Sequence, residues 1–243
     1  MTARPIMISV IIPTLNEAAS IETVLASVRE SLQTLTNDGA VTSDTPGAKV
    51  FEVIVVDGGS TDKTCALAQG LADCLIQAPR GRARQMNAGA ARARGEYLLF
   101  LHADTCLPGD AGAQLNAAIG VKTAWGRFDV RIEGESAMLG VIAKLMNWRS
   151  RLTGIATGDQ AMFVQRDMFE RVSGFADQPL MEDIELSRQL LAFAQPMCLP
   201  GPARTSGRRW EARGVWPTIL LMWRLRWRYW RGASAEELAK AYR

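Results

Sequence analysis

Residues 97–104, YLLFLHAD, decide the fold of this chain. The run from 97 to 102 is short and mainly apolar, as expected of a buried central strand. It stops at Asp104, and a helix is expected to start near Pro108. In open α/β sheets, ligands bind beyond the carboxyl ends of the strands, so His102 and Asp104 are candidate metal or phosphate contacts. The alternative is that Asp104 only caps the following helix.

Three strand-and-helix units are expected before this central strand. Their strands cover residues 6–12, 50–56 and 74–77, and each is apolar throughout. Strands that alternate with helices predict a mostly parallel sheet covered on both faces, which is an α/β fold. The polar stretch 36–48, TNDGAVTSDTPGA, predicts a mobile surface loop.

Polar and charged side chains follow these strands. Asn16 and Glu17 come after the first strand, Asp57 ends the second, and Arg82 and Arg84 open the helix after the third. Free backbone N–H groups at a helix N-terminus already favour anions. Because the carboxyl ends of parallel strands meet at one edge, carboxylates and arginines are expected to gather there.

The second half of the chain predicts further elements and acids. Residues 123–133 alternate as a strand does, and residues 137–152 predict an apolar helix. The string TGDQ, at 157–160, precedes a short strand. Glu182 and Asp183 open another helix, where acids suit the helix dipole, so helix-start chemistry is the alternative to a catalytic role.

The C-terminal tail combines tryptophans with arginines along one helix. A basic amphipathic helix suits a membrane interface, so residues 213–231 predict peripheral membrane contact. The alternatives are tryptophans that pack on the sheet domain, or a homodimer contact. The expected organisation is a catalytic domain over 1–205 and a helical tail over 206–243, packed on that domain or at a membrane surface.

Composition excludes several classes of protein. A net charge of +3 over 243 residues does not favour nucleic acid. Four cysteines without a CxxC pattern predict small buried residues in a reducing compartment, and a single histidine excludes a His-rich metal site. Without a signal peptide or about 20 consecutive apolar residues, we expect a cytoplasmic protein, with peripheral contact at the inner face of the membrane as the variant.

Five motifs in order resemble the family 2 glycosyltransferases, whose GT-A fold binds nucleotide sugars. They are SVIIPTLNE at 9–17, VIVVDGGSTD at 53–62, NAGAARARGEYLLFLHAD at 87–104, VSGF at 172–175 and MEDIELSRQL at 181–190. The strings GRARQMNAG, FLHADT, TGDQ, MEDIEL and SGRRWE also resemble a subgroup associated with radical-SAM genes and proposed to act in arsenosugar biosynthesis.

The resemblance implies a role for each matching position. Asp104 matches the last acid of the family's DxD motif, which holds Mn²⁺ or Mg²⁺ on the diphosphate of a UDP- or GDP-type sugar. Asp183 matches the general base of inverting members, with Glu182 as its substitute. The nucleotide-sugar side comprises Pro13, Asn16, Glu17, Asp57, Arg82, Arg84, Asn87, Ala103, Asp104, Arg209 and Trp210. The acceptor side comprises Gly158, Asp159 and Gln160.

Two positions depart from the family pattern. Many members have two acids where this chain has Asp57 and Gly58, so the contact to the base is in doubt. His102 stands at the first acid of the DxD motif. Imidazole suits Mn²⁺ better than Mg²⁺, so His102 is either a second metal ligand or a hydrogen-bond donor to ribose or phosphate.

The expected function is metal-assisted, inverting sugar transfer to an unknown acceptor hydroxyl. One alternative is a membrane-surface glycosyltransferase with a polyprenyl-phosphate acceptor. A nucleotidyltransferase is less favoured, because PTLNEAAS after the first strand lacks the basic, glycine-rich phosphate loop of those enzymes. A non-catalytic protein that binds a membrane or partner would leave the acids at the strand ends unexplained.

Overall fold

The computed structural model describes residues 7–35 and 50–242. The loop predicted over 36–48 lies outside the described residues. The strands are β1 (Ile8–Thr14), β2 (Phe51–Asp57), β3 (Cys74–Gln77), β4 (Tyr97–Phe100), β5 (Thr105–Cys106), β6 (Trp125–Glu133), β7 (Met162–Gln165) and β8 (Met197–Ser206). The helices are α1 (Ile21–Ser31), α2 (Thr64–Ala68), α3 (Arg82–Arg92), α4 (Ala111–Gly120), α5 (Met138–Thr153), α6 (Arg166–Arg171), α7 (Glu182–Leu191), α8 (Arg208–Arg213), α9 (Val215–Trp230) and α10 (Ala235–Tyr242), with a 3₁₀ turn η1 (Gly158–Gln160).

These strands form one sheet in the order β3-β2-β1-β4-β7-β6-β8-β5. The four strands of the N-terminal half are parallel, as the strand-and-helix pattern predicts. β7 runs antiparallel to β4 and to β6, whereas β6 and β8 are parallel. The predicted mostly parallel α/β sheet is therefore confirmed, with β7 as an antiparallel insertion.

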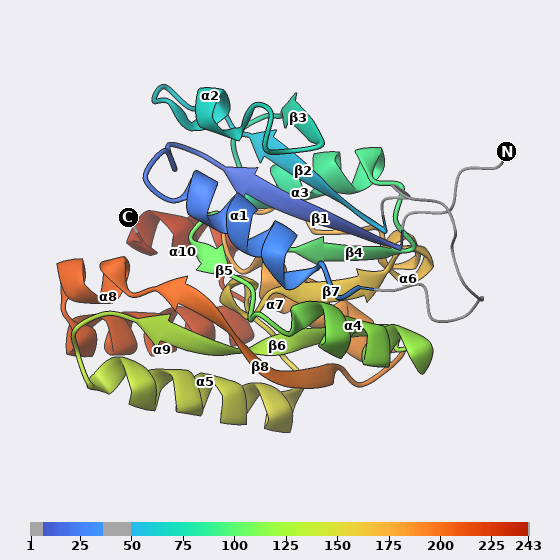
Figure 1. The fold of residues 1–243 in the computed structure, drawn as a ribbon. Helices are drawn as coiled ribbons and strands as arrows, with labels where there is room; N and C mark the ends of the chain where they lie inside the picture. The colour runs from blue at the N-terminus through green and yellow to red at the C-terminus, as the bar shows by residue number, and fades with distance from the viewer. Residues whose placement is uncertain (1–6, 36–49, 243) are drawn as a thin grey trace, which may run out of the picture.

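Helices cover both faces of the sheet (Figure 1). Successive residues of a strand point to opposite faces, so Val10 and Ile12 pack under α1 and α4 while Ile11 packs under α3 and α7. Because both faces are covered, the seven residues of β1 are all buried. This burial is why the N-terminal strands are apolar throughout rather than alternating.

Several predicted boundaries shift by a few residues. The first strand runs to Thr14 rather than Ile12, and β4 ends at Phe100, so His102 lies in the turn that follows it. Helices α2 and α4 begin at Thr64 and Ala111, slightly later than predicted. These shifts leave the polar residues at the same edge of the sheet.

The C-terminal helices α8, α9 and α10 lie together at the end of the sheet toward which β1 points (Figure 1). Leu225 of α9 and Leu238 of α10 are buried against Leu180 and Met181, in the loop before α7. The tail therefore packs on the sheet domain through leucines. The tryptophans of α9 do not make that contact, since Trp216, Trp223, Trp227 and Trp230 are 58–80% exposed. Trp210 of α8 is partly buried and packs against Ile132 and Leu139.

Two further predictions concern the cysteines and membrane-spanning helices. The four cysteines are free thiols, but each is partly exposed, so the prediction that they are buried is wrong. Their spacing carried no burial information. Within residues 7–35 and 50–242, no helix is long and apolar enough to cross a membrane.

Candidate active site

The tips of β1 and β2 lie side by side and hold Asp57. Thr14 is opposite Asp57 in the parallel register. One oxygen of Asp57, Oδ2, accepts hydrogen bonds from the backbone N–H groups of Gly59 and Ser60, both at 2.9 Å. Burial works against the charged carboxylate, but these bonds and the Ser60 hydroxyl hold the pKa of Asp57 below its ordinary value. The other oxygen, Oδ1, is buried without a hydrogen-bond partner, so it can accept a bond from a ligand.

Asn16 and Gln85 tie the loops around this tip together. Asn16 has a left-handed backbone (φ 56°), and its Oδ1 accepts a 2.8 Å bond from the backbone N–H of Thr61. Gln85 of α3 donates from Nε2 to the carbonyl oxygens of Thr14 and Val56, both at 2.8 Å. The sequence reasoning missed Gln85, because a glutamine inside a helix carries no distinctive signal.

Arg82 lies between residues predicted on the nucleotide-sugar side and residues predicted on the acceptor side. Its Nε is 3.2 Å from Oε1 of the buried Glu182. Burial would lower the pKa of Arg82, but nearby negative charge outweighs it and raises the pKa. That charge comes from Glu182, Asp183, Asp159 and Asp104. The carboxylates predicted at three different elements therefore converge on one guanidinium.

His102 pairs with Asp159. Nδ1 of the imidazole is 3.4 Å from Oδ1 of the carboxylate. Burial alone would lower the pKa of His102, but the hydrogen bond with Asp159 outweighs it and raises the pKa. Burial would likewise raise the pKa of Asp159, and the same partner lowers it. This pairing orients the imidazole through Nδ1, as the carboxylate partners of metal-binding histidines do, so the predicted metal role of His102 stays a prediction.

Asp183 is the second residue of α7 and lies half-buried beside the buried Glu182. Oδ2 accepts a 2.8 Å hydrogen bond from the backbone N–H of Gly158, and Oδ1 accepts one from Ile184. Burial and the charge of Glu182 outweigh these bonds and raise the pKa of Asp183 to about 6. Met181, just before it, adopts a left-handed backbone (φ 66°) that turns the chain into the helix.

Asp104 and Glu17 share a contact with the C-terminal tail. Nη2 of Arg208 lies 3.2 Å from Oε2 of Glu17 and 3.8 Å from Oδ2 of Asp104. The side chain of Asp104 is 31% exposed. Arg208 therefore connects α8 to the predicted metal ligand.

The described residues contain no cluster of three or more His, Cys, Asp or Glu side chains arranged to hold an ion. A complete protein cage for a metal is therefore not seen there. Mg²⁺ is commonly bound by one or two carboxylates that substrate phosphates complete. The accessible carboxylate of Asp104 fits that kind of site.

Four predicted residues have other roles in the structure. Arg84 pairs with Asp177 at 2.7 Å, and Asn87 bonds the backbone of Phe175. On α3 a side chain two positions after Arg82 points about 200° away from it, so Arg82 and Arg84 cannot face the same site. Gln160 and Ala103 are buried, Gln160 as the partner of Thr157 in a capping box.

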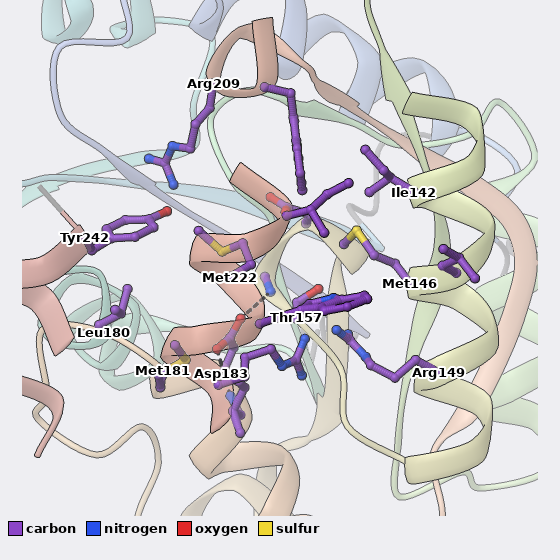
Figure 2. Close-up of a pocket in the computed structure, with 18 of the residues that line it drawn as sticks. Ile142, Met146, Arg149, Thr157, Leu180, Met181, Asp183, Arg209, Met222 and Tyr242 are labelled. Carbon is purple, nitrogen blue, oxygen red and sulfur yellow. Dashed lines mark hydrogen bonds between the residues drawn. The ribbon is translucent and has the colours of Figure 1, made fainter. Parts of the chain in front are cut away.

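A cavity of about 630 Å³ opens beside these carboxylates (Figure 2). The predicted residues Arg209 and Trp210 line it, as do Gly158 and Asp159. Asp57, Asn16, Glu17 and Asp104 do not line it. The cavity therefore brings the catalytic acids and the acceptor-side residues Gly158 and Asp159 together with Arg82, Arg209 and Trp210, which were predicted on the nucleotide-sugar side. The strand tips with Asp57 lie outside it.

Arg149 of α5 also lines the cavity, and the sequence reasoning missed it. An arginine within an amphipathic helix usually faces solvent, so its position gave no signal. In Figure 2 its guanidinium extends from α5 toward Thr157 and Asp183. Its Nε and Nη2 are buried without a hydrogen-bond partner.

The sequence of the chain matches the model of a known protein family. The model of glycosyl transferase family 2 matches residues 9–170, about two thirds of the chain. The chain belongs to this family. The matched region contains β1 to β7 and the loops that carry Asp57, Asp104 and Asp159.

Curated relatives resemble part of the chain. Proteins named PGL/p-HBAD biosynthesis glycosyltransferase from Mycobacterium bovis and Mycobacterium tuberculosis are 38% identical over 122 residues. That alignment covers 47% of this chain and 42% of each relative, so the chain spans less than half the length of the curated relatives it matches.

Solved structures share the fold. A Staphylococcus structure, S. aureus TarS 1-349 in complex with UDP, has a TM-score of 0.59 at 18% identity, over 82% of this chain and 60% of that one. The mannosyltransferase PcManGT from Pyrobaculum calidifontis, in complex with GDP-Man and Mn²⁺, has a TM-score of 0.60 at 23% identity, over 99% and 70%. These likenesses confirm the predicted glycosyltransferase fold.

Proposed function

We propose that this protein transfers a sugar from a nucleoside diphosphate sugar to an acceptor hydroxyl, with inversion at the anomeric carbon. The observation that carries the proposal is the position of Asp183, a half-buried carboxylate with a raised pKa that lines the cavity. A general base works best when its pKa lies near the operating pH, and a value of about 6 meets that condition.

The donor half supplies the contacts that a nucleotide sugar requires. The free Oδ1 of Asp57 is suited to accept a hydrogen bond from the ribose or base. Arg82 is positioned to stabilise negative charge on the leaving diphosphate, as charge-assisted hydrogen bonds do. In the direct displacement the acceptor oxygen attacks from the opposite side, and Asp183 takes its proton.

We further propose that a divalent cation, Mn²⁺ or Mg²⁺, binds at Asp104. Such an ion would neutralise charge that develops on the diphosphate. The PcManGT structure, which its title describes with GDP-Man and Mn²⁺, supports this assignment by similarity of fold. His102 is the second proposed ligand, with Asp159 orienting its ring through Nδ1.

Asp104→Ala tests the metal site. Because the variant lacks the proposed carboxylate ligand, we expect Mn²⁺ to stop strengthening the binding of a nucleotide sugar. The measurement is the dissociation constant by calorimetry with and without Mn²⁺. Asp110→Ala, at an exposed acid near the start of α4, is the matched control and should keep the full effect of Mn²⁺. A Mn²⁺ effect of wild-type size in Asp104→Ala would exclude this site.

The donor is tested by thermal shift with a panel of UDP- and GDP-linked sugars. At least one nucleotide sugar is expected to raise the melting temperature, and Asp57→Ala is expected to lose most of that rise. If no member of the panel changes the melting temperature, the proposal fails.

The family assignment and the geometry both favour glycosyl transfer over nucleotidyl transfer. The loop after β1 contains Asn16 and Glu17 and bonds the backbone of the β2 loop. It lacks the glycine-rich basic sequence that would cradle a triphosphate. The finer match to the radical-SAM-associated subgroup stays a prediction.

A further inference from the structure

The cavity continues outward from Asp183 as a groove between α5 and α9. Its walls include Ile142 and Met146 from α5 and Ile219 and Met222 from α9. Figure 2 shows Ile142 and Met146 projecting from α5 toward Met222 on α9. The groove is therefore apolar along its length and ends at the proposed catalytic base.

The outer rims of the groove expose two apolar stripes. Among the described residues, nine of the twelve exposed large hydrophobic side chains belong to α5 and α9, which concentrates them on one face. Each stripe follows the spacing i, i+4, i+7, i+11 of one helix face. The α5 stripe is Val141, Leu145, Trp148 and Leu152. The α9 stripe is Trp216, Leu220, Trp223, Trp227 and Trp230.

An exposed apolar face of this extent usually marks a binding site for an apolar partner. Both stripes contribute to the groove itself, since Leu145 and Trp148 on α5 and Trp216 and Trp223 on α9 line the cavity. The apolar surface is therefore continuous from the outer face of the protein to Asp183. A long apolar chain would cover the part of this surface that lines the cavity, which does not include Trp227 and Trp230.

Arg149 places a positive charge at the inner end of this apolar groove. Burial lowers the pKa of Arg149, and the charge of Asp183 partly opposes that effect. Neither Nε nor Nη2 has a hydrogen-bond partner. A buried guanidinium without a partner is costly, so an anionic group bound there would remove the penalty.

The charges on α9 also favour an anionic occupant over a second copy of the chain. The helix carries Arg224, Arg226 and Arg228 and no acidic residue, and of these Arg228 pairs with Glu237 of α10 at 3.5 Å. Two copies that met through α9 would bring these charges together. An amphiphile with an anionic head group would bury apolar surface of α9 and bring a negative charge to these arginines.

We propose that the acceptor is an anionic amphiphile: its apolar chain lies in the groove between α5 and α9, its phosphate binds Arg149, and its reacting O–H faces Asp183. This inference rests on the proposed function. In the transfer, the bond from the anomeric carbon to the diphosphate oxygen breaks, and a bond to the acceptor oxygen forms. The acceptor proton passes to Asp183, and the nucleoside diphosphate leaves with the electron pair.

The test is calorimetric titration of the full chain with decyl phosphate below its micelle concentration. We expect decyl phosphate to bind at least about tenfold more tightly than either 1-decanol or ethyl phosphate, because each control has only half of the recognised chemistry. If ethyl phosphate bound as tightly as decyl phosphate, the groove would not bind the apolar chain and that part of the inference would be wrong. The absence of decyl phosphate binding would overturn the whole inference.

Three variants separate the parts of the site. Arg149→Met is expected to weaken decyl phosphate about tenfold or more and to leave 1-decanol unchanged, as for a lost charge-assisted bond. Met222→Asp is expected to abolish binding of both. Trp230→Ala removes an exposed tryptophan of the same stripe that does not line the cavity, so it is the matched control and should bind as wild type.

Two results would assign the apolar face to another partner and overturn the inference. One is a loss of binding in Trp230→Ala as large as in Met222→Asp, which would indicate surface adsorption. The other is a dimer, detected by sedimentation, that excludes decyl phosphate. The calorimetry needs no donor, so amphiphile binding and nucleotide-sugar binding fail independently of each other.

Discussion

At the scale of single residues, the chemistry depends on how the protein holds Asp183. Two backbone N–H groups fix the carboxylate, while burial and Glu182 keep its pKa high. Glu182 is itself neutralised by Arg82 at 3.2 Å.

This arrangement predicts the pH dependence of catalysis. A general base acts when it is deprotonated, so kcat/KM should fall about tenfold per pH unit below about 6. Glu182→Gln removes the negative charge that raises the pKa of Asp183, and the acidic limb should then move to lower pH. The measurement is kcat/KM from pH 4.5 to 8. A limb that stays in place or moves to higher pH would contradict this electrostatic account.

Gly158 gives a second test at this scale. A Cβ added at this position would lie 2.2 Å from Cε1 and Nε2 of His102, so the imidazole or the turn must move. Movement of the turn would also disturb the N–H that holds Asp183. Gly158→Ala should lower kcat at least tenfold with a small change in melting temperature. Gly120→Ala, where a Cβ meets nothing within 4 Å, is the control. Full activity in Gly158→Ala would show that this contact is not needed.

At the scale of elements, the sequence predicted helices and strands correctly where one spacing of apolar residues is enough to identify the element. The apolar runs gave β1 to β4. Of the acids that follow these strands, Asp104 lies near Arg82, together with Asp159, Glu182 and Asp183 from the second half of the chain. The roles of Arg84 and Asn87 could not be judged, because they depend on the rotation of α3 about its axis. That rotation is fixed by packing against the sheet, which no local pattern records.

The packing of the tail has a consequence for the active site. Leu225, 1% exposed, contacts the cluster that contains Met181, the residue just before Glu182 and Asp183. Leu225→Ala should therefore lower the free energy of unfolding by about 2–4 kcal/mol and also reduce turnover. The measurement is urea unfolding together with kcat.

Leu220→Ala is the control for stability, because Leu220 lies on the same helix and is 65% exposed. It should change the free energy of unfolding by less than about 0.5 kcal/mol. Equal effects of the two substitutions would show that α9 does not dock through Leu225.

At the scale of the whole molecule, the proposed site consists of a donor half and an acceptor half that meet at Arg82. The donor half comes from the strand tips, and its residues were identifiable because the motifs lie at those tips. The acceptor groove joins α5 to α9, which are some 60 residues apart in the chain. Each helix has a recognisable apolar stripe, but only the fold shows that the two stripes border one cavity.

The most direct test of the central claim is turnover of a nucleotide sugar by the full chain with Mn²⁺. The measurement is release of nucleoside diphosphate from a panel of UDP- and GDP-linked sugars, with an alkyl phosphate that also carries a hydroxyl group as acceptor and with water alone. We expect release from at least one donor, and a fall of about 10² or more in Asp183→Asn. Asp167→Asn, at an exposed acid on α6, should match the wild type. Release that is absent for every donor, or undiminished in Asp183→Asn, would contradict the account.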